Sequence, residues 1–375
     1  MENWQDRKQN LFEICKKLFE DFTHNNNLIF IIDNPEDLYY YSRYWGEGIL
    51  IITQDKASKL IVPKLEYFRA TETSIDCDII QSERGKSLTE SVVNLLGTEV
   101  LVFYGGTDFW IIDEISRKIG KSKLKLNPEA LRQVRQIKEP VEIERIQKAS
   151  NIIDRLYKVA RNEIKVNISE EEIQSTLVYE AMRLGARFPT YQFTSNPLIV
   201  ASGPNGSFPH AETSSRKIQD GDLIVLDITL SYNHYISDAT RTFGIGNVSP
   251  EKKEVYDIVY QAQLQGIGKI ATSTDFSEID AACRNLIKEA GYGEKFIHST
   301  GHGIGLEVHE LPWIRPNFKS KISENMTITI EPGIYISNKF GVRIEDSLLI
   351  KSVSDSKKGF EFLNFHSYDK ELIIL

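Results

Sequence analysis

The sequence predicts an α+β protein of two domains, in which a smaller mixed α/β domain precedes a larger α+β domain. Three observations lead to this prediction. The chain has 375 residues, whereas one domain commonly runs to about 100–200 residues. Short apolar runs alternate with helical patterns up to about residue 127. Beyond the turn-forming Asn127-Pro128, long amphipathic segments are interleaved with strand patterns. We therefore expect domains of residues 1–127 and 128–375.

The first domain contains four short apolar runs with the length and composition of buried strands. These runs cover residues 28–33, 48–53, 60–63 and 100–106. Residues 87–97 begin with a serine, keep helical spacing and end with a glycine, which predicts a helix. Strands that alternate with helices indicate a mixed α/β fold.

The second domain opens with a predicted long helix. Its apolar positions recur every three to five residues from Pro140 to about Ala160, and proline suits the first helical position because its missing N–H would have no partner there. Ser169 and Glu172 form a capping-box pattern for a second helix, which should stop at Gly185. Two more helices and four strands follow. The helices cover residues 249–272 and 277–291, and the strands cover residues 222–230, 235–243, 326–331 and 342–351.

Charge and cysteine content exclude several classes of protein. The net charge is −8 and no long basic run occurs, which disfavours nucleic-acid binding. No apolar stretch approaches the roughly 18–20 residues of a membrane span, and the N-terminus is too charged for a signal peptide. Three widely spaced cysteines, Cys15, Cys77 and Cys283, suit neither a disulfide framework nor a cysteine-based zinc site. We expect a cytoplasmic protein whose chemistry comes from histidines and carboxylates.

Two aspartates lie on adjacent predicted strands, where aspartate is uncommon. Asp227 lies in LIVLDITL and Asp238 in YISDATRTF. A loop of Tyr232-Asn233 would put them directly opposite each other, whereas a loop of Asn233-His234 would make them diagonal neighbours. Both registers put them on one face, so their repulsion calls for a shared proton or a cation. An exposed hairpin with two solvated acids is the alternative.

Two glutamates lie on a second pair of predicted strands. Glu331 ends MTITIE just before Pro332-Gly333, and Glu345 lies in GVRIEDSLLI. Arg343 precedes Glu345 by two residues, so it should lie on the same strand face and could pair with Glu345 alone. One arginine does not neutralise four carboxylates, and a buried unpaired carboxylate is strongly unfavourable. A bound cation explains the set better.

A histidine completes the candidate ligand set. His302 lies in STGHGIGLEVHE, between glycines that let the backbone and its neighbours approach closely. These glycines lack the GxGxxG spacing of a dinucleotide site. Four carboxylates and one imidazole suit divalent manganese, cobalt, iron or zinc. Because four carboxylates carry four negative charges, two divalent ions per chain balance them better than one.

These segments together resemble the pita-bread metallopeptidases, and the whole chain resembles their proline-specific members, the Xaa-Pro dipeptidases (prolidases) and aminopeptidases P. The matching segments are FPHAE, LDITLSYNHYISDATRTF, STGHGIGLEVHE, TIEPGIY and VRIED, in the order of the family. Each motif alone is weak, but five in order are highly specific. The resemblance implies a pita-bread catalytic domain and a creatinase-like N-terminal domain that forms a homodimer and overhangs the site.

The resemblance further implies a centre of two divalent metal ions. The ligands would be Asp227, Asp238, His302, Glu331 and Glu345, with Asp238 and Glu345 shared by both ions. A hydroxide held between the metals would attack the Xaa-Pro bond at the N-terminus of a dipeptide or short peptide. The catalytic residues would be Glu331, which relays the proton, and His298 and His309, which stabilise the oxyanion or orient the carbonyl. The substrate-binding residues would be His210, His298, His309 and Arg343.

Two positions depart from the family. Thr229 and His234 stand where glycine is common, and we expect neither residue to touch a metal ligand. Histidine tolerates the positive φ of a tight turn better than most residues, so the hairpin should survive.

Several alternatives stay open at this point. The moderate length and short C-terminal tail favour a dipeptidase over an aminopeptidase P that acts on longer peptides. Creatinase works without metals, and methionine aminopeptidase usually lacks such a first domain. A catalytically silent pita-bread binding protein would typically have lost ligands, and here all five are present. No GxSxG elbow occurs and the cysteines lie outside the histidine motifs, which disfavours a serine or cysteine nucleophile.

Overall fold

The computed structural model divides the chain into two compact units, Met1–Arg135 and Gln136–Leu375. It describes residues 3–18, 28–83, 85, 87–97, 100–105, 108–189, 196–354, 357–362 and 371–375. In the first unit α6 (Pro128–Arg135) packs on α1 (Trp4–Leu18). The break therefore follows Arg135 and lies after the turn near residue 127 where we expected it.

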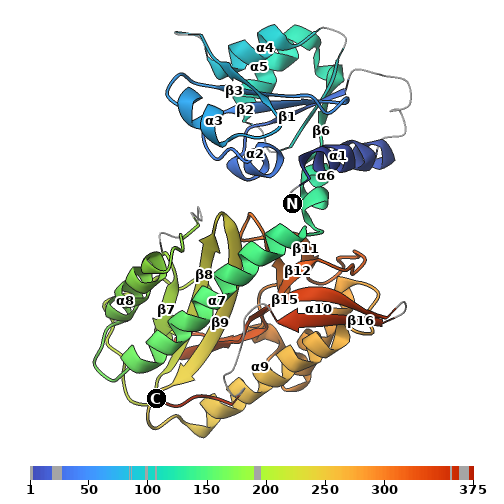
Figure 1. Cartoon of the computed structure of the whole chain (residues 1–375). Helices are drawn as coiled ribbons and strands as arrows, with labels where there is room; N and C mark the ends of the chain where they lie inside the picture. The colour runs from blue at the N-terminus through green and yellow to red at the C-terminus, as the bar shows by residue number, and fades with distance from the viewer. Residues whose placement is uncertain are drawn as a thin grey trace. The chain divides into compact units, whose positions relative to one another are not determined.

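The first unit is built on a six-stranded mixed sheet with the order β4-β3-β2-β1-β5-β6, coloured blue to cyan in Figure 1. Its strands are β1 (Leu28–Ile32), β2 (Ile49–Thr53), β3 (Ser58–Val62), β4 (Asp78–Gln81), β5 (Leu101–Tyr104) and β6 (Leu124–Leu126). Strand β1 pairs antiparallel with β2 and parallel with β5. The prediction of a mixed α/β domain is thus confirmed, with β4 and β6 added to the four expected strands.

Helices surround this sheet, and α4 and α5 share its apolar core. The helices after α1 are α2 (Pro35–Ser42), α3 (Tyr67–Thr73), α4 (Leu88–Leu95) and α5 (Phe109–Ile119), and a 3-10 turn covers Lys121–Lys123. Helix α4 begins after Ser87, whose side chain accepts a hydrogen bond from the Glu90 backbone N–H. Buried Val92 and Ile115 from the two helices join strand residues in one cluster.

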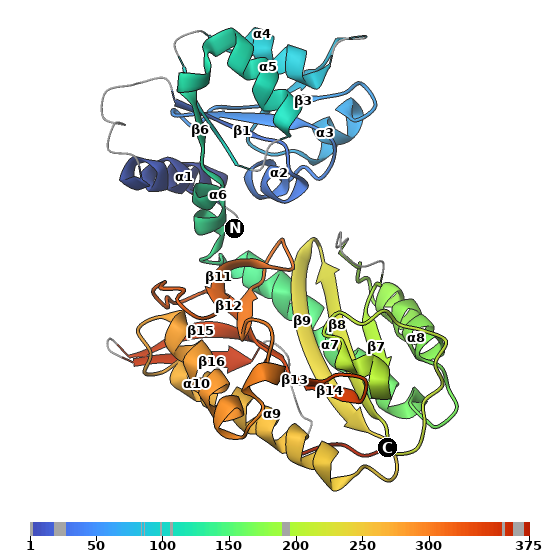
Figure 2. The ribbon, with the colours of Figure 1, turned by 180° about the vertical axis from the view of Figure 1, so that it is seen from behind.

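The second unit contains two helix-covered sheets. In the first half, α7 (Pro140–Glu163) and α8 (Glu170–Arg183) pack on the antiparallel sheet of β7 (Ile199–Ser202), β8 (Leu223–Tyr232) and β9 (Tyr235–Gly244). Helix α7 crosses β8 and β9 in Figure 1 and lies behind them in Figure 2, so it covers one face of this sheet.

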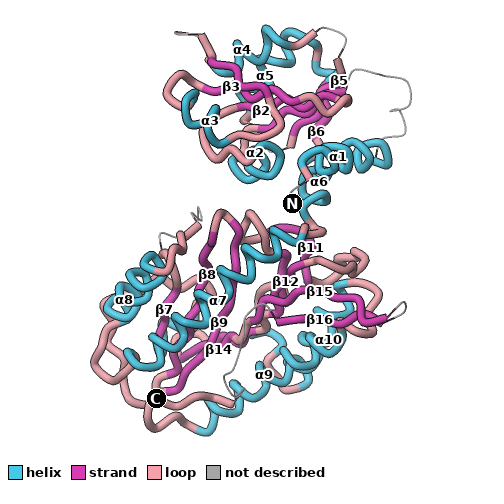
Figure 3. The backbone as a smooth tube through the Cα atoms, in the orientation of Figure 1, coloured by secondary structure: helices cyan, strands magenta, loops and turns pink. Residues whose placement is uncertain are grey.

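In the second half, α9 (Pro250–Lys269) and α10 (Phe276–Glu289) share a core with a five-stranded sheet of order β11-β10-β12-β15-β16. Its strands are β10 (Gly301–Gly303), β11 (Glu310–Ile314), β12 (Thr327–Ile330), β15 (Asp346–Ser354) and β16 (Lys357–Phe362). A hairpin of β13 (Gly333–Ile336) and β14 (Phe340–Arg343) and the 3-10 turns Gly203–Ser207 and Gly293–Lys295 complete the unit (Figure 3). No helix among the described residues is long and apolar enough to cross a membrane.

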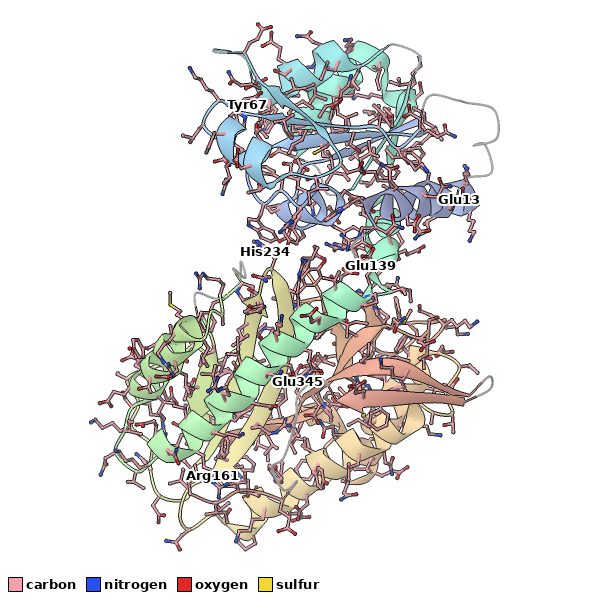
Figure 4. All side chains as sticks on the ribbon, in the orientation of Figure 1. Glu13, Tyr67, Glu139, Arg161, His234 and Glu345 are labelled. Carbon is pink, nitrogen blue, oxygen red and sulfur yellow. The ribbon has the colours of Figure 1, made fainter. Side chains whose placement is uncertain are left out.

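Local signals place two helix starts where the sequence predicts them. In the capping box of α8, the Glu172 N–H donates to Ser169 Oγ at 3.2 Å and Glu172 Oε2 accepts from the Ser169 N–H at 2.7 Å. Helix α7 starts at Pro140 behind a second capping box, in which Glu142 Oε2 accepts from the backbone N–H of Glu139, labelled in Figure 4. These caps satisfy N–H groups that have no partner inside the helix.

The predicted strand over residues 342–351 is wrong in one respect. The chain changes sheets in its middle, because β14 ends at Arg343, paired with β13, and β15 begins at Asp346, paired with β12. Glu345 therefore lies between two strands. The structure also adds β7, β10, β11, β13 and β16 to the strands that the sequence predicts in this unit.

The β8–β9 hairpin settles the register that the sequence leaves open. Its two-residue loop is Asn233-His234, with φ values of 47° and 72°, and Tyr232 pairs with Tyr235. Positive φ at both central residues is the geometry of the turn that best matches strand twist. Thr229 consequently lies opposite Asp238, and Thr240 lies opposite Asp227. The two aspartates are diagonal neighbours on one face.

Candidate metal centre and active site

All nine residues that the sequence singles out line one cavity of about 670 Å³ in the second unit. They are His210, Asp227, Asp238, His298, His302, His309, Glu331, Arg343 and Glu345. They come from segments up to 135 positions apart, counted from 210 to 345, so the fold, not the local sequence, assembles the set.

The five candidate ligands meet where several strands end or bend. Asp227 and Asp238 come from β8 and β9, His302 from β10, and Glu331 follows β12 directly. One ligand atom each of Asp238, His302 and Glu345 lies within 4.8 Å of the others. His302 Nε2 is 3.4 Å from Glu331 Oε1. This spacing is small enough for a common metal centre.

The carboxylates are held where their charges are unfavourable. Burial, followed by the charges of Glu345 and Asp227, raises the pKa of Asp238 well above its usual value. Burial and the charge of Glu345 likewise raise the pKa of Glu331. The pKa of Glu345, labelled in Figure 4, rises to about 8 because of burial and the charge of Asp227. In the metal-free protein, bound protons must offset the repulsion between these carboxylates. Near neutral pH, bound metal cations would offset this repulsion better than protons do.

Two buried carboxylate oxygens provide a direct test of whether metal ions fit. Asp227 Oδ1 and Glu345 Oε1 have no hydrogen-bond partner within the described part of the chain. The second oxygen of each is engaged: Asp227 Oδ2 accepts from Arg343 at 2.6 Å, and Glu345 Oε2 accepts from Thr240 at 2.7 Å. A buried acceptor without a partner costs free energy. A cation between these oxygens would remove that cost, so the residues fit a metal centre.

His302 is arranged as a neutral ligand. Its Nδ1 lies 3.0 Å from the Gly303 carbonyl oxygen, which fixes the proton on Nδ1 and leaves the Nε2 lone pair toward Glu331. Burial, then the neighbouring His309, lowers the pKa of His302 well below its usual value. The flanking glycines have the predicted steric role, because a Cβ on Gly301 or Gly303 would collide with a backbone carbonyl of an adjacent strand.

Arg343 pairs with Asp227 and not with Glu345, its neighbour in sequence. Its Nη2 donates to Asp227 Oδ2 at 2.6 Å. Nε donates to Thr240 Oγ1 at 3.1 Å, and Nη1 donates to Tyr335 Oη at 2.7 Å and to the Pro209 carbonyl at 3.2 Å. Four of the five N–H groups of this buried guanidinium are therefore used inside the protein, which makes it a brace for Asp227.

Tyr335 is a site residue that the sequence reasoning missed. Its hydroxyl accepts from Arg343 and lies 3.1 Å from His298 Nε2. His298 Nδ1 lies 2.8 Å from the Ser299 carbonyl oxygen, so the proton is on Nδ1 and Nε2 accepts from Tyr335. Burial and the charge of Arg343 lower the pKa of His298 to about 3. The only sequence signal for Tyr335 is its place in the quoted segment TIEPGIY.

Two threonines donate hydrogen bonds to the candidate ligands Asp238 and Glu345, and one of them corrects an expectation. Thr229 Oγ1 donates to Asp238 Oδ1 at 2.8 Å, so the prediction that Thr229 touches no candidate ligand is wrong. The cross-strand register puts these two side chains on the same face. Thr240 makes the corresponding contact with Glu345. Each acid thus receives one hydroxyl donor from the hairpin.

His210 and His309 lie at the wall of the cavity. The His309 ring is 4.4 Å from the His302 ring, edge to face, and stacks against Trp313 at 6.2 Å. Burial is the main cause that lowers the pKa of both His210 and His309. The lowered pKa favours the neutral form of both rings.

Much of the remaining wall of the cavity is apolar. Its side chains include Pro197, Phe208, Ile297 and Trp313. Phe208 is 58% exposed and Ile297 is 65% exposed, although both are large apolar residues. An exposed apolar surface beside a polar centre is typical of a ligand site. This wall suits a pyrrolidine ring or an aliphatic side chain.

Comparisons with known families agree with this geometry. Residues 144–352 match Metallopeptidase family M24. Residues 15–156 match the Creatinase/Prolidase N-terminal domain. The two matches together cover both units of the structure.

Individual relatives are similar over nearly their whole length. The chain is 36% identical to the Xaa-Pro dipeptidase of Pyrococcus furiosus over 90% of this chain and 95% of the relative. The solved prolidase from Pyrococcus horikoshii OT3 has a TM-score of 0.85 at 33% identity, covering 98% and 100% of the two chains. The X-Pro aminopeptidase from Thermotoga maritima MSB8 has a TM-score of 0.80 at 30% identity, covering 94% and 98%.

Proposed function

The chain belongs to metallopeptidase family M24, and from this membership we propose that it is a metal-dependent Xaa-Pro dipeptidase. One observation carries the proposal: nine residues predicted for this chemistry surround one cavity, and two of their buried carboxylate oxygens have no hydrogen-bond partner among the described residues. The relatives named Xaa-Pro dipeptidase or prolidase span almost the same length as this chain. Their substrate is therefore the first one to test.

We propose that Asp227, Asp238, His302, Glu331 and Glu345 hold two divalent ions of manganese, cobalt, zinc or iron. Carboxylate-rich sets with one imidazole accept several such ions. When bound, the ions supply Lewis-acid activation of a water and of the scissile carbonyl. The unpaired oxygens of Asp227 and Glu345 and the exposed lone pair of His302 support this assignment.

Glu331 is proposed to move the proton of the reaction. Its carboxylate takes a proton from the attacking water and delivers it to the proline nitrogen as the peptide bond breaks. In the metal-free protein, burial and the charge of Glu345 raise the pKa of Glu331 above its usual value. His302 Nε2, 3.4 Å away, limits the directions in which Glu331 Oε1 can point.

The histidines and the apolar wall are proposed to orient the substrate. His309, stacked on Trp313, donates its N–H to the carbonyl oxygen on which negative charge develops. Both ring nitrogens of His298 have hydrogen-bond partners, Ser299 and Tyr335. His298 can therefore contact the substrate only after its hydrogen bond with Tyr335 breaks. His210 and the apolar residues of the cavity contact the proline side.

Two further proposals concern the whole protein. The match of the first unit to the Creatinase/Prolidase N-terminal domain is the basis for proposing a homodimer built through that unit. The three cysteines, all within described segments, form no disulfide, which supports a cytoplasmic location. Size-exclusion chromatography with light scattering tests the first of these proposals.

The central test uses protein stripped with a chelator and reloaded with manganese or cobalt. Ala-Pro, Ala-Pro-Ala and the control dipeptide Met-Ala are offered as substrates, and released amino acids are quantified. We expect metal to restore hydrolysis of Ala-Pro and not of Met-Ala. Asp238→Asn serves as the inactive variant, and its metal content is measured in parallel.

Hydrolysis of Ala-Pro without any metal would contradict the metal-dependent mechanism. Failure of both manganese and cobalt to restore hydrolysis, together with an unchanged metal content in Asp238→Asn, would contradict both the activity and the site. In that case the silent binding protein would be the better description.

A further inference from the structure

A second pocket of about 450 Å³ adjoins the catalytic cavity in the same unit. The two share Ile297, His298, Ser299 and Trp313 as lining residues, so this segment forms their common border. The lining of the second pocket adds Arg284 and Arg315 and contains no carboxylate among the described residues. A pocket lined by two arginines and by no described carboxylate is unexpected beside a site of four acids in a chain of net charge −8. Such a lining suits an anion.

Two of the three arginines that line these pockets already bind groups within the protein. Arg343 uses four of its five N–H groups, as described above. Arg284 donates to both oxygens of Asp280, at 3.0 Å and 2.8 Å, and to the carbonyls of Phe296 and His298. Its charge is balanced by Asp280, and its position fixes the backbone that carries His298.

Arg315 differs from both. Its guanidinium makes no hydrogen bond or ion pair with any other residue that the structure describes, and its side chain is exposed. The guanidinium carbon lies 5.7 Å from the centre of the Trp313 ring and 5.9 Å from the centre of the Phe318 ring. Such contacts with two aromatic rings restrict the side chain while leaving its N–H donors available.

The position of Arg315 determines which part of a bound peptide it can contact. Arg315 lines the second pocket but not the catalytic cavity, where the scissile bond and the proline must lie. One more residue extends a peptide by about 3.3–3.6 Å, and a residue that reaches Arg315 from the catalytic cavity has to pass the border formed by Ile297, His298 and Trp313. A planar guanidinium binds a carboxylate through two parallel hydrogen bonds.

We propose that the second pocket is a subsite for the residue after proline and that Arg315 binds the C-terminal carboxylate of an Xaa-Pro-Yaa tripeptide. This inference rests on the proposed Xaa-Pro hydrolysis and extends its substrate class from dipeptides to tripeptides with a free C-terminus. Arg315 is then a residue that determines substrate length and the state of the C-terminus. It takes no part in bond cleavage.

The test compares four peptides with the metal-loaded full-length protein: Ala-Pro, Ala-Pro-Ala, Ala-Pro-Ala-amide and Ala-Pro-Glu-amide. We expect kcat/KM for Ala-Pro-Ala to exceed that for its amide about tenfold, which corresponds to about 1.4 kcal/mol. In Arg315→Gln this preference should disappear through a rise in KM, with kcat/KM for Ala-Pro unchanged. Lys319→Gln is the matched control, because it removes an exposed cation four positions along the sequence from Arg315 that does not line the pocket.

Three results would overturn the inference. Equal cleavage of acid and amide by the unchanged protein would show that no carboxylate is recognised. A preference for Ala-Pro-Glu-amide over Ala-Pro-Ala-amide, without one for Ala-Pro-Ala, would assign the pocket to an acidic side chain. Loss of the preference in Lys319→Gln as well would indicate a general field of positive charge, which salt would also screen.

A binding measurement separates this inference from the proposed function. Calorimetric titration with Pro-Ala and Pro-Ala-amide, the products of tripeptide cleavage, requires no turnover. We expect Pro-Ala to bind about tenfold more tightly than its amide, and Arg315→Gln to remove the difference. If none of the Xaa-Pro peptides is cleaved but this difference is found, the proposed function fails while the carboxylate site stands. If peptides are cleaved and the difference is missing, only the subsite is refuted.

Discussion

Arg343 Nη2 donates to Asp227 Oδ2 across 2.6 Å, between two residues 116 positions apart in the sequence. The contact leaves Asp227 Oδ1 buried and without a partner in the described part of the chain. One oxygen of Asp227 is thus fixed by the protein, and the other is presented to the cavity. The same guanidinium holds Thr240 and Tyr335, whose hydroxyls contact Glu345 and His298. Arg343 therefore connects a candidate metal ligand on β8 with supports on β9 and β13.

Arg343→Lys should cause a large loss of activity although the positive charge is kept. A single ammonium does not reproduce the planar arrangement that reaches Asp227, Thr240 and Tyr335 together. We expect kcat/KM for Ala-Pro to fall about a hundredfold and metal affinity to weaken. Steady-state kinetics and metal titration measure both effects. Arg183→Lys, at an exposed helical position, should behave like the unchanged protein, and near-normal activity of Arg343→Lys would refute the bracing role.

Thr229→Val removes one hydroxyl while keeping the β-branched shape of the side chain. The lost hydrogen bond is the one from Thr229 Oγ1 to Asp238 Oδ1, 2.8 Å long. Because residues that orient metal ligands commonly contribute about 10–100-fold, we expect metal affinity to fall about tenfold. Isothermal titration with manganese measures the change. Thr53→Val in β2 of the first unit is the control, and equal losses in both variants would show that the effect is not specific to the site.

Much of the fold follows from local patterns, and this explains which predictions hold. The capping box of α8 is a contact between Ser169 and Glu172, three residues apart, so sequence alone reveals it. The common face of Asp227 and Asp238 follows from the two-residue period of strands, which holds in either register. The choice between registers depended on the backbone of Asn233-His234, which composition does not determine.

Other features depend on contacts between distant segments. The sequence around Glu345 predicts one continuous strand. In the structure, the segment before Glu345 pairs with β13 and the segment after it pairs with β12. Arg343 has Glu345 nearby in sequence and yet pairs with Asp227 across the unit. The contacts of Tyr335 and the place of Arg315 beside the second pocket depend on the positions of one hydroxyl and one guanidinium group. No periodicity encodes such positions, so only the structure reveals them.

The buried acids should make the metal-free protein less stable as pH rises. Burial and the charge of Asp227 raise the pKa of Glu345 from 4.5 to about 8 in the folded state. Between these values the folded protein holds a proton that the unfolded chain has released, so the free energy of unfolding falls with increasing pH. The ordinary histidine pKa is 6.5, so histidines of the unfolded chain still lose protons just above this pH and oppose the trend there, whereas they are mostly neutral in both states above about pH 7.

Thermal unfolding of chelator-treated protein between about pH 7, where most histidines of the unfolded chain are neutral, and the Glu345 pKa of about 8 tests this expectation. The melting temperature should fall across this range, and added manganese should raise it most at the upper end, since metal binding requires deprotonated ligands. Glu345→Gln should flatten the dependence, whereas Glu251→Gln, at an exposed position, should keep it. A melting temperature that rises with pH in metal-free protein would contradict the assignment.

Glu170 provides the last prediction, because it holds the loop that carries His210. This glutamate is fully buried at the start of α8 and accepts five hydrogen bonds of 2.6–3.0 Å from Ser202, Asn205 and Ser214. In Glu170→Gln, the amide nitrogen would face these donors and release the loop. We expect stability to fall by about 1–3 kcal/mol and kcat/KM for Ala-Pro to fall about tenfold, mainly through KM, while exposed Glu171→Gln changes neither.

If Glu170 acts through His210, the double variant with His210→Ala should lose no more activity than His210→Ala alone, whereas additive losses would show that Glu170 only stabilises the fold.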